Sequence, residues 1–92
     1  MNKIERHKQT LDEIHSIYKE KNEKYGDSFS LSLDKYGLIA FLVRASDKYN
    51  RIENIIVNDV EDTEDERLID SLKDLANYCL MCVNWIDEKN SK

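Results

Sequence analysis

The segment LANYCLMCVNWI, from Leu75 to Ile86, decides which fold this chain can adopt. It has no glycine or proline, and only Asn77 and Asn84 interrupt its apolar residues, so it predicts a helix that is apolar on almost every side. Such a helix needs other helices around its whole circumference. Because two further helices of one short chain cannot easily supply that cover, we expect a homodimer or higher homo-oligomer with this helix near the shared core.

The same helix is expected to run from about residue 64 to residue 88. Its first half is amphipathic, with apolar residues at helical spacing: Leu68, Ile69, Leu72, Leu75 and Ala76. Thr63 and Glu66 match a capping box, which places the start of the helix near Glu64 and gives Glu66 a sufficient structural role. The carboxylate-rich residues 58–66 predict a solvated loop.

Two more helices precede this one. Residues 3–24 have large side chains at helical spacing, at Ile4, His7, Leu11, Ile14, Ile17 and Tyr18, and residues 36–56 predict the second helix. Between them, Gly26 ends the first helix, and the alternation of Phe29, Leu31 and Leu33 with polar residues predicts a connector that is partly extended. The expected fold is all-α: one domain, residues 1–92, whose three helices form a small antiparallel bundle completed by homodimerisation.

Composition limits the classes of function. The chain has 92 residues, a net charge of −5, no proline and two glycines, which favours helix and argues against a general nucleic-acid binder. It has no apolar run long enough to cross a bilayer and no signal peptide pattern, so we expect a cytoplasmic protein without a membrane partner. Cys79 and Cys82 lie inside the apolar helix, where we expect buried core thiols.

The second helix carries a cationic stripe, defined as Arg44, Lys48 and Arg51 together with Asp47. These positions fall at i, i+4, i+7 and i+3, on one side of a helix. The opposite side is expected to pack inward through Leu38, Leu42, Ala45, Tyr49 and Ile52. Three cations around one carboxylate predict one wall of a site for an anion such as a phosphate.

The third helix carries an acidic stripe at steps of four, four and three: Glu66, Asp70, Asp74 and Asn77. Asp74 lies where the helix becomes apolar, and a buried carboxylate needs a cation or a metal. Asp47, Asp70 and Asp74 could supply oxygen ligands to Mg²⁺. The alternative, which periodicity alone favours, is a structural ion pair between the acidic and cationic stripes.

Tyr25 and Phe29 flank the expected turn after the first helix. One interpretation is a connector that Phe29 anchors in the core. The other is a lid in which Tyr25 or Phe29 contacts a ligand, because loops often carry function. Both interpretations stay open.

Four motifs occur in order along the chain: KYGDSF at 24–29, YGLI at 36–39, RASDKYNR at 44–51 and DSLKDLANY at 70–78. This succession, over about residues 21–86, resembles the small "nucleotide modification associated domain" family of phages, prophages and some bacteria. That family is thought to be related to the all-α nucleoside triphosphate pyrophosphohydrolases of MazG type, which are helical bundles, usually dimerise, and hold Mg²⁺ through carboxylates on two facing helices.

The resemblance implies roles for single residues. It places the carboxylates Asp47, Asp70 and Asp74, with Glu66 less directly, at a metal or nucleotide site. It places the cations Arg44, Lys48 and Arg51 near the phosphates, and Asn77 near the base or sugar. MazG-type enzymes carry E-x-x-E and E-x-x-D, whereas this chain has Arg44-x-x-Asp47 and Asp70-x-x-x-Asp74. A cation thus replaces one expected ligand, which weakens the case for hydrolysis but suits phosphate binding.

The predicted function is therefore a MazG-like nucleotide-binding protein, with Mg²⁺-dependent (d)NTP pyrophosphohydrolysis in phage or prophage nucleotide metabolism as one chemistry. Two alternatives remain open. The first is a non-catalytic phage protein that sequesters a nucleotide signal of host defence. The second is a helical interaction module without a ligand.

Overall fold

A computed structural model describes residues 1–58 and 67–91 as an all-helical chain. Its four described helices are α1 (Lys3–Tyr25), α2 (Ser28–Tyr36), α3 (Ile39–Ile56) and α4 (Leu68–Asn90). The expected all-α helical bundle is confirmed. The expected count of three helices is wrong, because the predicted connector contains α2. None of the described helices is long and apolar enough to cross a membrane.

The α2 helix forms because Phe29 and Leu33 lie one turn apart and are both buried. Leu31, on the other side of the helix, is 68% exposed. Phe29 and Leu33 are therefore an i, i+4 pair on one side of a helix, although the same residues also fit the alternation that predicted an extended segment. The helix ends at Gly37, whose φ of 72° and ψ of −159° place it in a region that is almost closed to other residues.

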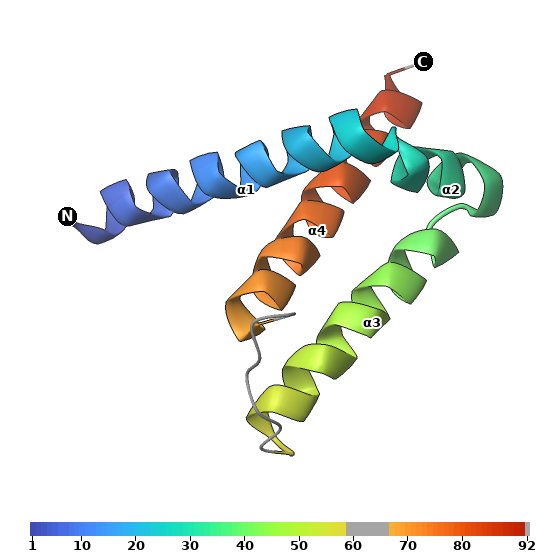
Figure 1. The fold of residues 1–92 in the computed structure, drawn as a ribbon. Helices are drawn as coiled ribbons and strands as arrows, with labels where there is room; N and C mark the ends of the chain where they lie inside the picture. Colours follow the sequence, from blue (N-terminus) through green and yellow to red (C-terminus); the bar gives the residue numbers. More distant parts are fainter. Residues whose placement is uncertain (59–66, 92) are drawn as a thin grey trace.

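The end of α1, the whole of α2, the start of α3 and the second half of α4 lie close together (Figure 1). α3 and α4 lie side by side in opposite directions and form the most extensive helix pair. The C-terminal half of α1 crosses α4, whereas its N-terminal half projects beyond the other helices, and residues 1–13 are all exposed.

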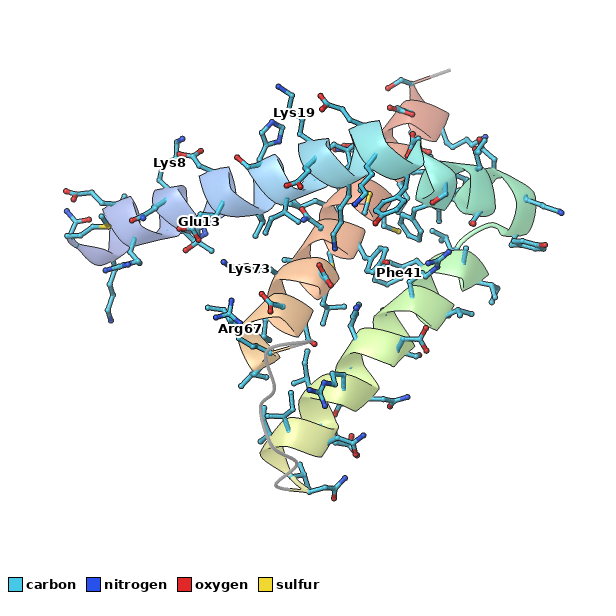
Figure 2. All side chains as sticks on the ribbon, viewed as in Figure 1. Lys8, Glu13, Lys19, Phe41, Arg67 and Lys73 are labelled. Atoms are coloured by element: carbon cyan, nitrogen blue, oxygen red, sulfur yellow. The ribbon has the colours of Figure 1, made fainter. Side chains whose placement is uncertain are left out.

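Polar contacts fasten α1 to α4, and two of them lie at the middle of α1. The buried Asn77 side chain donates a hydrogen bond to the Ile14 carbonyl at 3.0 Å. Lys73 approaches Glu13 at 3.3 Å, and Figure 2 shows these two side chains on facing sides of the crossing. The middle of α1 is therefore held at a defined position along α4.

The core lies where α2, the start of α3 and the second half of α4 meet. Phe29, Leu33 and Ala40 form its centre, and partly buried hydrophobic residues pack around them: Phe41, Tyr78, Met81 and Trp85. The indole N–H of Trp85 donates to Asp34 at 2.9 Å, so its polar atom is satisfied at the edge of the core.

Several packing predictions are wrong. On α3, Leu38, Leu42 and Tyr49 are about half exposed, at 49%, 56% and 58%, although Ile52 is buried. Cys79 is exposed, whereas Cys82 is buried as expected. The physical reason is similar in both cases, because α3 packs against α4 and α2, and α4 packs against α3, α1 and α2, through other sides than the ones that carry these residues. The homodimer stays a prediction.

The start of α4 also differs from the prediction. The helix begins at Leu68, after an Arg67 with extended backbone. The backbone N–H of Arg67 donates to Asp70 at 3.3 Å, which satisfies one group at the helix start. The predicted capping box of Thr63 and Glu66 lies outside the described residues. The predicted role of Glu66 as a metal ligand lies outside them too.

Candidate functional site

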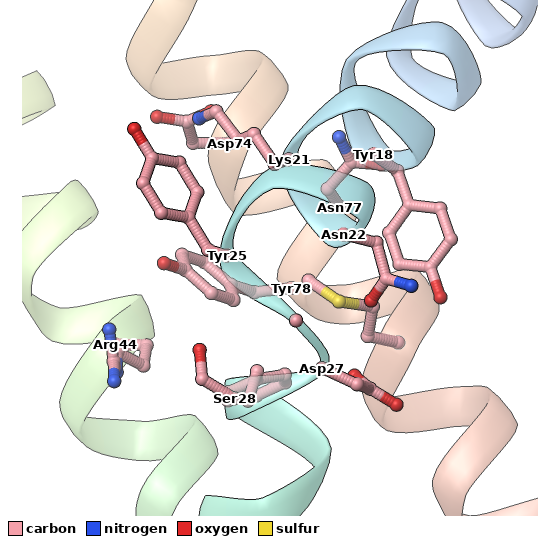
Figure 3. Close-up of a pocket in the computed structure, with 13 residues that line it drawn as sticks. Tyr18, Lys21, Asn22, Tyr25, Asp27, Ser28, Arg44, Asp74, Asn77 and Tyr78 are labelled. Atoms are coloured by element: carbon pink, nitrogen blue, oxygen red, sulfur yellow. The ribbon is translucent and has the colours of Figure 1, made fainter.

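A pocket of about 360 Å³ lies between the end of α1, the start of α2 and the adjoining sides of α3 and α4 (Figure 3). Five of the residues predicted from the sequence line it: Tyr25, Phe29, Arg44, Asp74 and Asn77. Gly26 allows the tight passage from α1 to α2 here, since its φ of 71° falls in a region that favours glycine. The fold thus gathers side chains from all four described helices.

Arg44 supplies the cationic wall of the pocket from α3. Its side chain is exposed and makes no hydrogen bond or ion pair with any residue in the ranges 1–58 and 67–91. Ser28, at the first position of α2, lines the same region. A guanidinium placed in this way can donate two parallel hydrogen bonds to an anion.

Asp74 is the acidic centre of the pocket, and two lysines hold it. Lys21 of α1 lies 3.1 Å from one carboxylate oxygen, and Lys48 of α3 lies 3.1 Å from the other. The side chains of Asp74 and Lys48 are 19% and 22% exposed, so this part of the network is largely shielded from water. The network joins three helices. Its Lys48–Asp74 pair agrees with the structural ion-pair alternative for the two stripes, whereas Lys21 was not part of that prediction.

The charged residues that line the pocket balance one another. Lys21 and Arg44 contribute two positive charges, and Asp27 and Asp74 contribute two negative ones, which leaves a net charge of zero. The whole chain carries −5. The pocket is therefore less acidic than the protein as a whole, and Arg44 is its cation without a carboxylate partner among the described residues, which favours an anionic ligand beside Arg44.

Aromatic rings form much of the remaining wall. Phe29 and Tyr78 pack edge to face, with ring centroids 5.0 Å apart and an angle of 64° between the rings. Tyr25, at the end of α1, is largely exposed beside them. Phe29 is buried and anchors α2, so the connector interpretation is right for its position, and it still lines the pocket.

Asn77 has a structural task that the sequence did not reveal. Its amide nitrogen donates to the Ile14 carbonyl, and the side chain is buried while lining the pocket. One N–H of the Asn77 amide is therefore used within the chain, and only the other amide atoms could take the predicted role near a base or sugar.

The other predicted residues lie elsewhere. Asp47 is exposed on α3, and Arg51 is half-buried farther along that helix. Asp70 pairs with Arg67, whose Nε lies 3.1 Å from the carboxylate. The side-chain hydrogen bond from Arg67 lowers the pKa of Asp70. None of these residues lines the pocket, and Lys48 reaches it only through its ion pair with Asp74.

The predicted Mg²⁺ ligands do not form one cluster in the described parts of the chain. No three His, Cys, Asp or Glu residues there lie close enough together to hold a metal ion. Asp74 is engaged by two ammonium groups and Asp70 by a guanidinium. As placed in a single chain, these carboxylates do not fit a Mg²⁺ site.

Lys21 is the cation among the pocket residues that sequence reasoning missed. It belongs to a stripe on α1 with Tyr18, Asn22 and Tyr25, all of which line the pocket. Their spacing of i, i+3, i+4 and i+7 is the same signal that marked the cationic stripe. Lysine and glutamate are frequent along residues 3–24, so nothing in the sequence distinguishes Lys21 from the other charged residues of this helix.

Comparison of the chain with known protein families, curated proteins and solved structures found no match in any of the three. The resemblance to the nucleotide modification associated family therefore stays a prediction.

Proposed function

We propose that the protein binds a nucleotide or nucleotide-derived small molecule in this pocket. The phosphate groups lie against Arg44, and the base lies against the ring of Tyr25 and the edge of the Phe29–Tyr78 pair. One observation carries the proposal: the Arg44 side chain lines a pocket with aromatic walls and makes no contact within the described ranges that would neutralise it.

The chemistry of the walls supports this class of ligand. Phosphate matches the guanidinium fork, and base–aromatic stacking contributes roughly 1–3 kcal/mol per base. A volume of about 360 Å³ also falls within the range of about 300–1,000 Å³ that is usual for small-molecule pockets.

Binding without turnover is favoured over hydrolysis. Hydrolysis of MazG type would need carboxylates that are available to Mg²⁺, whereas Asp74 and Asp70 are engaged by cations of the same chain. We therefore favour a protein that sequesters a nucleotide, as in the neutralisation of a nucleotide signal in a phage or prophage setting. We expect the binding form to be a homodimer, as the sequence predicts.

Calorimetry with ribonucleoside and deoxyribonucleoside triphosphates and cyclic dinucleotides, each with and without Mg²⁺, tests the proposal. At least one ligand should bind with one site per chain. Arg44→Ala should weaken its binding by about tenfold to a hundredfold, since a hydrogen bond to a charged group contributes about 1.5–3 kcal/mol. The melting temperature should change little because the side chain makes no hydrogen bond or ion pair within the described ranges.

Arg6→Ala is the matched control, because Arg6 is an exposed arginine on the N-terminal half of α1, outside the pocket. Equal effects of the two substitutions, or the absence of binding at millimolar nucleotide, would contradict the proposal. Release of phosphate or pyrophosphate in the presence of Mg²⁺ would show that the protein hydrolyses the nucleotide instead of sequestering it. Absence of all binding, with a stable fold, would favour the interaction module.

A further inference from the structure

The side of α4 that faces away from the pocket is an uncovered apolar surface. Six of its residues are exposed although they are hydrophobic or carry a thiol: Ile69, Leu72, Cys79, Leu80, Val83 and Ile86. With 3.6 residues per turn, these positions share one side of the helix. The pocket residues Asp74, Asn77 and Tyr78 lie on the opposite side.

α3 continues this surface. Leu38, Leu42, Tyr49 and Ile56 are 49%, 56%, 58% and 63% exposed, and their spacing of four, seven and seven residues places them on one stripe. Arg44, which lines the pocket, lies on the other side of α3. Because α3 packs along α4, the two exposed stripes form one surface, which we call the α3–α4 face.

We propose that a second copy of this chain docks on the α3–α4 face. Two antiparallel helix pairs then form a four-helix bundle around a shared core. The two pockets lie on the outer sides of this dimer, and each is built from the residues of one chain.

Charge favours a second copy as the occupant. The ten residues named for the face are uncharged, and Asp87, four residues after Val83, is an exposed charge at its edge, whereas the chain as a whole carries −5. Two such acidic chains repel one another wherever their charged surfaces meet, and this repulsion is weaker at a face with few charges. The same face can serve both partners about a two-fold axis.

The spacing along the helices favours a bundle. On α4, Leu72, Ala76, Cys79, Val83 and Ile86 alternate at steps of four and three, and on α3 Leu38, Leu42, Ala45, Tyr49, Ile52 and Ile56 do the same. Steps of three and four are the pattern of helices that pack at a small crossing angle in coiled coils and four-helix bundles.

The extent of the face is suitable for a stable dimer. At about 1.5 Å per residue, helices of 18 and 23 residues are about 27 and 34 Å long, and two helices side by side are about 20 Å wide. This flat footprint of roughly 600 Å² becomes larger when surface relief is counted, and a stable dimer buries about 800 Å² per partner. A single chain buries few apolar side chains, so the dimer also supplies core.

Sedimentation equilibrium of the full chain under reducing conditions tests the proposal. The wild type should have twice the chain mass of 10.9 kDa. Leu72→Glu on α4 and Leu42→Glu on α3 should each raise the dimer dissociation constant at least a hundredfold. Leu31→Glu, at a similarly exposed leucine of α2 outside the face, should leave the dimer intact, and so should Arg44→Ala in the pocket.

Cys79 gives a readout in the wild-type chain, which avoids substitutions that could unfold the protein. It is exposed in the single chain and lies in the middle of the face, whereas Cys82 is buried within the chain. Iodoacetamide labelling followed by peptide mass spectrometry should show slow modification of Cys79 in concentrated protein and faster modification after dilution. A monomer at all concentrations, or a dimer in which Cys79 reacts at the rate of the diluted chain, would overturn the proposal. Dissociation by Leu31→Glu but not by Leu72→Glu would also overturn it.

Discussion

Asp74 tests the ion-pair network at the scale of a single residue. Its carboxylate holds Lys21 and Lys48, and the pair with Lys48 is largely shielded from water. Asp74→Asn should therefore lower the free energy of unfolding by about 1–3 kcal/mol, between the values for surface pairs and for fully buried pairs. Urea denaturation followed by circular dichroism measures this change.

The control for Asp74→Asn is the loss of an ion pair that is exposed to solvent. Asp12→Asn breaks the 2.7 Å ion pair of Asp12 with Lys8, in which both side chains are well exposed, and should change stability by less than about 0.5 kcal/mol. If Asp74→Asn abolished nucleotide binding and left stability unchanged, Asp74 would be a ligand-binding residue instead of a structural one.

The same network shows how far single residues could be predicted. Facing stripes on two helices predicted that a cation such as Lys48 could reach Asp74, and the distance agrees. The second partner, Lys21, depends on where α1 crosses α4, and helical periodicity does not contain that information. Periodicity also grouped Asn77 with the acidic stripe, because it shows only which residues share a side of one helix. It does not show that the Asn77 side chain donates to the Ile14 carbonyl where α1 crosses α4.

At the scale of an element, α2 allows a matched comparison of two leucines. Leu33 is fully buried, whereas Leu31 is 68% exposed on the same helix. Leu33→Ala should destabilise the protein by about 2–4 kcal/mol through lost burial and a residual cavity. Leu31→Ala should change it by less than about 0.5 kcal/mol. Urea denaturation of both variants checks this, and equal effects would mean that α2 does not pack as described.

This helix was missed because two patterns overlap in nine residues. Alternation of polar and apolar residues indicates a strand, whereas Phe29 and Leu33 alone indicate one turn of helix. Tertiary packing against Tyr78 and Trp85 decides between them. The long helices α1, α3 and α4 carry several turns of consistent spacing, and for that reason their existence could be predicted from the sequence.

The start of α4 has a pH dependence. Hydrogen bonding from the Arg67 side chain holds the pKa of Asp70 below its ordinary value of 3.8. A carboxyl group whose pKa is lowered by folding stabilises the protein above its unfolded pKa, and this contribution is lost as pH falls through and below that value. The wild type should therefore be more stable than Asp70→Asn at pH 7, and the difference should shrink towards pH 3.

Urea denaturation of both proteins at the two pH values measures this difference. The expected direction is fixed, because a protonated Asp70 no longer carries the charge that Arg67 binds. A difference in unfolding free energy that stayed constant from pH 7 to pH 3 would show that the ion pair does not form in solution.

At the scale of the whole molecule, the sequence predicted a larger hydrophobic core than the one that a single chain forms. It assigned one whole side of α3 to the interior of a single chain, but α3 packs mainly against α4 and also against α2, which leaves Leu38, Leu42 and Tyr49 about half exposed. Periodicity identifies which residues share a face, and it does not say whether the covering surface belongs to the same chain. The apolar character of Leu75–Ile86 nevertheless indicated that one chain would leave part of that helix uncovered.

Folding and association should therefore be coupled. If the dimer completes the core, the midpoint of thermal unfolding must rise with protein concentration, because the folded state is favoured by mass action. Each tenfold rise in concentration adds about 1.4 kcal/mol, and for a folding unit of roughly 150–250 residues this shifts the midpoint by about 3–6 °C. Circular dichroism melts from micromolar to several hundred micromolar measure this shift.

Two substitutions separate the effect of association from other effects on stability. Leu72→Glu should melt at a lower temperature that does not depend on concentration, whereas Leu31→Glu should keep the wild-type dependence. A wild-type midpoint that stayed constant over a hundredfold change in concentration would show that the single chain is stable with its α3–α4 face exposed.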